Sequence, residues 1–180
     1  MPEGLRVASP VPRNLELKAV DPDPAATLAA ALALGAEEEA TLHQRDTYFF
    51  AVTGRLKLRE APPEPAQLIG YARPDRSRAS VSVYEIAPVF DPATLGAVLA
   101  QTLGVRTVVE KRRRLLLWRG ARIHLDRVAG LGDFVEIEAV ASSPGGPAAE
   151  EPKVAELRQA LGIGDERLVA VGYADLLPQR

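Results

Sequence analysis

The sequence contains no cysteine, and only two of its 180 residues are histidines, His43 and His124. Without cysteine the chain forms no disulfide bond, no thiolate metal site and no cysteine nucleophile. Two histidines also leave little for an imidazole-rich zinc site. Any metal would therefore be held mainly by carboxylate oxygen atoms.

Long apolar runs are also missing. No stretch approaches the roughly 18 apolar residues of a transmembrane helix, and residues 1–6 lack the basic region and hydrophobic run of a signal peptide. We therefore expect no membrane association and a cytoplasmic location. Neither charge dominates, because 22 Lys and Arg stand against 24 Asp and Glu, and 47% of the residues are apolar. This composition predicts a globular domain and argues against nucleic acid as a partner.

Strands are the main elements that the sequence predicts. Residues 1–12 contain three prolines and little periodicity, which indicates a loose leader before a single domain over 13–180. Eight strands are predicted, at 13–20, 46–52, 55–60, 67–73, 79–86, 106–118, 121–129 and 133–141. Helices are predicted at 25–36, 91–103, 153–161 and 165–177. Short turns link several strands, which favours an α+β fold on a large antiparallel sheet or barrel.

Alternate residues of these strands form two sets, because residues i and i+2 share one face. In the first strand, Leu15 and Leu17 alternate with Asn14, Glu16 and Lys18. Other strands repeat the pattern with Arg55, Lys57 and Arg59; Tyr71 and Arg73; Lys111 and Arg113; Arg122, His124 and Asp126; Glu136 and Glu138. In one strand alone this is typical of a half-buried sheet. Taken together, the lysines, arginines and carboxylates suit a polyanion and its metal, and they line either solvent or the concave inside of a closing sheet.

Several blocks of sequence resemble one family. Residues 14–18 (NLELK) resemble the ExExK opening of the CYTH family, also called triphosphate tunnel metalloenzymes. The likeness continues in order through residues 46–49, 54–59, 71–74, 109–113 and 123–138, and it spans nearly all of 13–177. One position differs, because Asn14 stands where the motif has its first glutamate. An amide oxygen can bind a hard cation but brings no charge.

The resemblance implies an eight-stranded antiparallel barrel whose charged interior binds a triphosphate with Mg²⁺ or Mn²⁺. It assigns the phosphate oxygens to the basic residues Lys18, Lys57, Arg59, Arg73, Lys111 and Arg113, while Arg55 is expected at the rim. It assigns the metal to the acidic residues Glu16, Asp126, Glu136 and Glu138, with Asn14 as a further candidate. Such a site needs alignment and charge stabilisation rather than a covalent nucleophile.

Three functions stay open at this level. The segment around Gly130, Leu131 and Gly132 is most similar to the class IV adenylate cyclases, which convert ATP to cyclic AMP and pyrophosphate. The alternatives are a triphosphatase that hydrolyses tripolyphosphate or thiamine triphosphate, and a domain that binds triphosphate or polyphosphate without turnover. The oligomeric state is also open, with a homodimer as one alternative.

Overall fold

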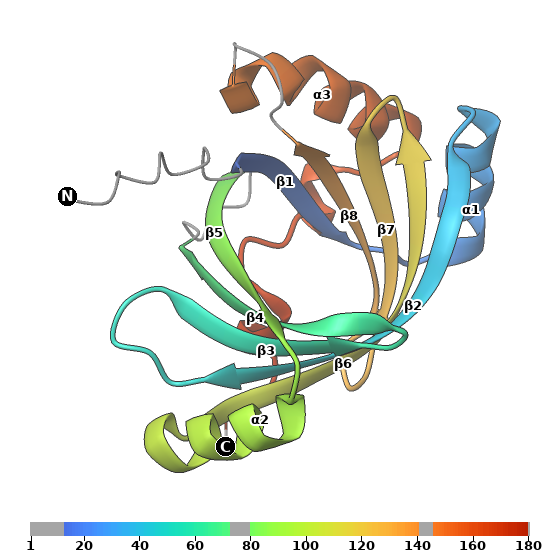
Figure 1. The fold of residues 1–180 in the computed structure, drawn as a ribbon. Coiled ribbons are helices and arrows are strands. Elements are labelled where there is room, and N and C mark those ends of the chain that lie inside the picture. Colours follow the sequence, from blue (N-terminus) through green and yellow to red (C-terminus); the bar gives the residue numbers. More distant parts are fainter. Residues whose placement is uncertain (1–12, 73–79, 141–145, 180) are drawn as a thin grey trace.

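The computed structural model describes residues 13–72, 80–140 and 146–179 (Figure 1). The predicted site residue Arg73 and the predicted leader, 1–12, lie outside these residues, so the division into a leader and a single domain stays a prediction. The strands are β1 Arg13–Val20, β2 Glu37–Phe49, β3 Arg55–Ala61, β4 Glu64–Ala72, β5 Ser80–Val89, β6 Val105–Trp118, β7 Ala121–Val128 and β8 Gly132–Val140. The α-helices are α1 Pro24–Ala33, α2 Pro92–Leu103, α3 Glu151–Ala160 and α4 Tyr173–Leu176, and the 3₁₀ helices are η1 Gly146–Glu150 and η2 Asp165–Arg167.

The strands form a closed barrel in the order β1-β5-β4-β3-β2-β6-β7-β8. Every neighbouring pair is antiparallel. Strand β1 closes the barrel, because it pairs with β5 on one side and with β8 on the other. The predicted eight-stranded antiparallel barrel with flanking helices is therefore confirmed.

Two strands begin at least three residues before their predicted starts. Strand β2 begins at Glu37 rather than Asp46, and its first half is largely exposed on both faces, so it lacks the apolar alternation that marks a strand. Its long pairing with β6, from Glu37 opposite Leu117 onward, is what makes this half a strand. Strand β4 begins before residue 67, so Pro65, which was expected outside any strand, lies at its start.

The end of the chain also differs from its prediction. A continuous helix over 165–177 is wrong: η2 is followed by extended chain, and only Tyr173–Leu176 is α-helical. The extended part pairs with β1, since the Val169 amide donates to the Lys18 carbonyl oxygen (2.9 Å) and Leu168 forms a bridge with Ala19. Pairing with the barrel thus replaces helical hydrogen bonds here. No helix in the described residues is long and apolar enough to cross a membrane.

The largest apolar core lies outside the barrel wall. Outward-facing residues of β1, β6, β7 and β8, including Leu17, Leu116 and Ile137, form one buried cluster with Ala31 of α1 and Leu157 of α3. In Figure 1 these two helices flank the barrel on the side of β6, β7 and β8. Because helices cover the apolar face of these strands, the alternate side chains point into the barrel. The inside of the barrel is therefore where the charged set lies.

Candidate functional site

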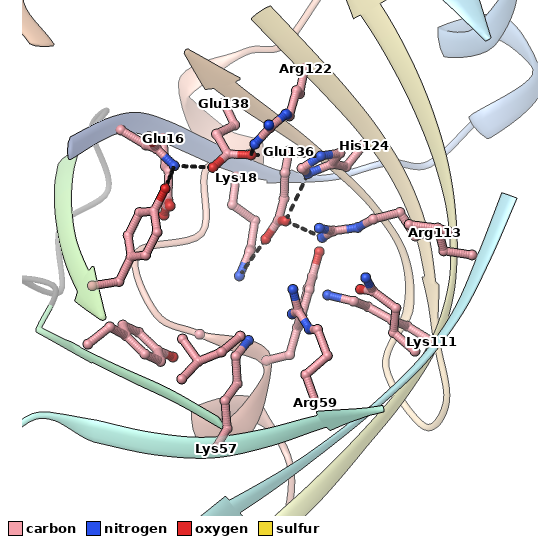
Figure 2. A pocket seen from close by; sticks show the side chains of 18 of the residues that line it. Glu16, Lys18, Lys57, Arg59, Lys111, Arg113, Arg122, His124, Glu136 and Glu138 are labelled. Carbon is pink, nitrogen blue, oxygen red and sulfur yellow. Dashed lines mark hydrogen bonds and ion pairs between the residues drawn. The ribbon is translucent and has the colours of Figure 1, made fainter. Parts of the chain in front are cut away.

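A cavity of about 420 Å³ occupies the barrel interior. Of the predicted site residues, the structure places these along its wall: Asn14, Glu16, Lys18, Lys57, Arg59, Lys111, Arg113, Glu136 and Glu138. Figure 2 shows the glutamates gathered on one side, with Lys57 and Arg59 on the other. The alternating pattern in the sequence thus becomes a ring of charged side chains around one cavity.

One side of the ring is organised by Asp46, a buried carboxylate on β2. It lies opposite Arg59 in the β2–β3 register. It accepts hydrogen bonds from Lys57 Nζ (2.9 Å) and from Arg59 Nε and Nη2 (both 2.7 Å). Burial alone would raise the pKa of Asp46, but the charges of Lys57 and Arg59 outweigh it and hold this pKa well below its usual range. Asp46 therefore stays ionised and fixes two cations that face the cavity.

A second anchor holds Arg113. Its Nε and Nη2 atoms form a forked pair with Asp126 (2.6 and 2.5 Å), and Nη2 also reaches Glu136 (2.5 Å). The Asp126 side chain has no exposed surface and also accepts from the Tyr173 hydroxyl (2.9 Å). Both of its oxygen atoms thus have protein donors. Its expected role as a metal ligand stays a prediction, and what the geometry gives it is an anchoring role.

Two buried lysines in the ring lack full compensation of their charge. Burial, aided by the charge of Arg113, lowers the pKa of Lys111 to about 7, and burial with the charge of Arg59 lowers the pKa of Lys57 to about 8. The carboxylate paired with Lys111 is that of Asp126, at 3.7 Å. An anion in the cavity would offset these crowded positive charges.

The opposite side of the ring lies where β1 meets β8. Lys18 forms an ion pair with Glu136 (3.0 Å). One step along the strands, Glu16 lies directly opposite Glu138. Like charges directly opposite each other destabilise a sheet unless something positive lies between or beside them. Arg122 provides part of this charge from the rim, where it pairs with Glu138 at 3.3 Å.

The donors around this carboxylate pair suit the divalent cation that the resemblance implies. Asn14 is buried and donates to Glu138 and to the Tyr84 hydroxyl, while its own Oδ1 has no hydrogen-bond partner. Within the described ranges, no three His, Asp or Glu side chains form a group that could hold a metal. Mg²⁺ is often held by one or two carboxylates together with substrate phosphates, so a complete protein cage is not required. Glu16, Glu138 and the Asn14 amide oxygen therefore fit a site that the ligand's own oxygens complete.

Several residues of the site were not assigned from the sequence. Asp46 was noted only as part of a similar block, because its pairing with Lys57 and Arg59 depends on the β2–β3 register. Tyr173 was predicted to lie in a continuous helix. It lines the cavity instead, and its ring centroid lies 3.7 Å from Lys18 Nζ. A short segment that enters the barrel leaves no periodic pattern in the sequence, so the position of Tyr173 could not be predicted. Arg55, expected at the rim, pairs with Asp175 (3.1 Å) beside Tyr173.

Several solved structures superpose on this chain. The PH1012 protein from Pyrococcus horikoshii OT3 superposes with a TM-score of 0.81 at 22% identity, covering 91% of this chain and 99% of that one. An adenylate cyclase candidate from Vibrio parahaemolyticus gives 0.73 at 17% (91% and 96% covered). HpAC1 from Hippeastrum, described as an adenylyl cyclase candidate with a dominant triphosphatase activity, gives 0.61 at 16% (89% and 91% covered).

The TM-scores establish a shared fold. No curated protein sequence matches the chain. The model of the CYTH domain matches residues 12–173. This match covers most of the 180 residues, and the barrel has the charged interior that the resemblance implies. The chain belongs to the CYTH family.

Proposed function

We propose that this protein is a metal-dependent enzyme that acts on a triphosphate-bearing small molecule bound inside the barrel. The carrying observation is that basic side chains from three strands converge on one cavity: Lys18, Lys57, Arg59, Lys111 and Arg113. Arginine gives forked contacts to phosphate oxygens and lysine acts as a point charge. A triphosphate is a small anion with enough negative charge and length to contact several of these cations at once.

The charge balance of the cavity supports a metal complex of the substrate. Glu16, Glu136 and Glu138 offset part of the basic ring, so the protein alone does not neutralise a triphosphate completely. Mg²⁺ or Mn²⁺ held near Glu16 and Glu138 would supply the missing positive charge and align a phosphate group. Phosphoryl chemistry needs mainly alignment and charge stabilisation, which fixed cations such as Arg113 provide.

Two reactions fit this binding mode. In the first, which we favour from the likeness to class IV adenylate cyclases, the 3′-hydroxyl of ATP attacks the α-phosphorus and gives cyclic AMP and pyrophosphate. Three apolar residues that line the cavity, Leu42, Leu115 and Ile86, could contact an organic group such as the nucleoside. In the second, water attacks the terminal phosphorus of tripolyphosphate or thiamine triphosphate. The dominant triphosphatase activity of HpAC1 favours keeping this second candidate.

Product analysis distinguishes the two reactions. Purified protein is incubated with ATP, tripolyphosphate and thiamine triphosphate, each with Mg²⁺ or Mn²⁺. Cyclic AMP selects the cyclase, and phosphate without cyclic AMP selects the triphosphatase. If no substrate turns over while tripolyphosphate still raises the melting temperature, the protein is a binding domain and the enzymatic proposal is wrong.

A further inference from the structure

Helix α2 lies outside the barrel, on the side opposite α3 (Figure 1), and the barrel covers it incompletely. Its Gly96 faces β3, since a Cβ atom there would lie 3.3 Å from the Leu58 side chain. Leu95 and Leu99 are half-buried on the same side of the helix. None of its twelve residues, all of which the structure describes, is fully buried, whereas α1 and α3 bury two residues each. One side of α2 therefore packs against the barrel and the other is open.

The open side of α2 carries a stripe of residues with helical spacing. Phe90, just before the helix, is followed at this spacing by Thr94, Ala97, Val98 and Gln101. All five are exposed, and Phe90 is 99% exposed and Val98 51%. A hydrophobic residue at the position of Phe90 often packs back onto the first turn of its helix. The exposure of Phe90 shows that its ring points into solvent instead.

The same side of the molecule lacks charge. Residues 92–105 contain no charged side chain, although 26% of the whole chain is charged. Phe50, which follows β2, extends this surface at the other end of the helix, where it lies against Gly104 and is 46% exposed. A helix that is apolar on both sides is normally buried on both sides. We call the following residues the α2 face: Phe50, Phe90, Thr94, Ala97, Val98, Gln101 and Leu103.

The α2 face is complementary to itself. It has an aromatic residue at each end, Phe90 before the helix and Phe50 after it, and the small residue Ala97 between them. In a second copy turned antiparallel about a two-fold axis, Phe90 of each copy lies near Phe50 and Leu103 of the other. Ala97 of both copies lies close to the axis, where a small side chain lets two helices approach. Two-fold dimers use one such patch on both subunits.

The charges around α2 also favour a second copy as the partner. An uncharged face meets its own copy without placing like charges opposite each other. In the antiparallel order, the positive end of each helix dipole lies beside the negative end of the other. A helix that binds a membrane surface carries Lys and Arg along its polar side, and α2 has neither. The α2 face therefore suits a protein surface of the same composition better than a lipid surface.

We propose that the protein is a homodimer in which two copies pack through the α2 face about a two-fold axis. The described residues that line the cavity include none from α2. Each subunit therefore keeps its own cavity, and the inference does not depend on the proposed function.

Sedimentation velocity tests the dimer over a range of micromolar protein concentrations. We expect the native protein to sediment as a dimer. Val98→Glu brings two negative charges together across the axis, so it should raise the dissociation constant of the dimer about 100-fold or more. The matched control is Leu32→Glu on α1, because Leu32 is 46% exposed, and its dissociation constant should stay at the native value.

Two results would overturn the inference. One is a native protein that sediments as a monomer throughout the range, and its flotation with vesicles of neutral lipid would then assign the α2 face to a membrane surface. The other is a native dissociation constant for the Val98→Glu protein, since the dimer would then use another surface. Val98 is exposed, so neither result depends on a change in the core.

Cross-linking tests the antiparallel arrangement itself. Because the chain has no cysteine, a single introduced cysteine is the only site for a short bifunctional maleimide. We expect the Ala97→Cys protein to give a linked dimer on a denaturing gel, because residue 97 of both copies lies near the axis. The Leu32→Cys control should stay unlinked under the same conditions. Equal linking of the two variants, or none in the Ala97→Cys protein, would contradict the arrangement.

Discussion

The outer and inner faces of the barrel are built from the same strands, but the outer face is apolar and the inner face is charged. In β8, Val135 and Ile137 point outward and have no exposed surface, while Glu136 between them points inward to Lys18 and Arg113. The outer face gains free energy by removing apolar surface from water. The inner face buries charges, which costs free energy even when they are paired. The outer face therefore stabilises the fold, whereas the inner face places charged side chains where the proposed substrate would bind.

The largest expected effect lies on the outer face. Leu116 of β6 is fully buried among the strands and helices of the outer core. We expect Leu116→Ala to lower the free energy of unfolding by about 2–5 kcal/mol, because it removes packed methyl groups and leaves a cavity. Urea unfolding measures this loss. Tripolyphosphate affinity should stay at the native value under conditions where the variant is folded. A loss below about 1 kcal/mol, as for a surface change, would contradict the stabilising role of the outer face.

The next effect lies on the inner face. Arg59→Met removes one forked cation, while Asp46 keeps its bond to Lys57. A hydrogen bond to a charged group contributes about 1.5–3 kcal/mol, so we expect affinity for tripolyphosphate to fall roughly 10- to 100-fold. Calorimetry measures the affinity. The matched control is Arg114→Met, an exposed arginine that bonds to Glu38 outside the cavity and whose loss should leave the affinity unchanged. Equal losses for both variants would contradict the assignment.

A third effect concerns the carboxylates. In Glu138→Gln the pair with Glu16 loses one negative charge, so most of the gain in tripolyphosphate affinity on adding Mg²⁺ should disappear. Adding Glu136→Gln should also abolish metal-dependent turnover while the fold remains. The control is Glu60→Gln, whose carboxylate pairs with Arg45 outside the cavity. If the Mg²⁺-dependent gain survives in the Glu138→Gln protein, the metal lies elsewhere.

The smallest effect is a dependence of stability on pH. Lys111 and Lys57 have lowered pKa values of about 7 and about 8 in the fold, whereas an unfolded lysine titrates near 10.4. From about pH 7 to about pH 9 the unfolded chain therefore binds more protons than the folded one, so the free energy of unfolding should rise with pH in this range. Lys111→Met should make the rise shallower. A fall across the same range in the native protein would contradict the lowered values.

Much of the fold follows from local sequence, because alternation, caps and turns are local signals. Asp91, Pro92 and Gly104 begin and end α2 as predicted, and the Asp91 side chain accepts from the Thr94 amide (3.0 Å). The first half of β2 did not follow, since its residues are exposed on both faces and only pairing with β6 orders them. The helix predicted after η2 was wrong for a related reason. That segment forms a hydrogen bond with β1, which is far away in the sequence.

The candidate site follows the same division. The inward side chains Lys57, Arg59, Lys111 and Arg113 could be selected by alternation alone. Their anchors could not, because the pairing of Asp46 with Arg59 depends on strand register, and the contact of Tyr173 with Lys18 depends on where the chain end returns. Sequence therefore predicts which residues face the cavity better than it predicts which residues hold them there.

The most direct measurement is a crystal structure of the protein with tripolyphosphate and Mn²⁺, in which anomalous scattering locates the metal. We expect the phosphate chain inside the barrel, in contact with Lys57, Arg59 and Arg113, and the metal beside Glu16 and Glu138. A phosphate chain bound only on the outer surface, with the cavity side chains unchanged, would contradict the central claim that the inner face is the binding site.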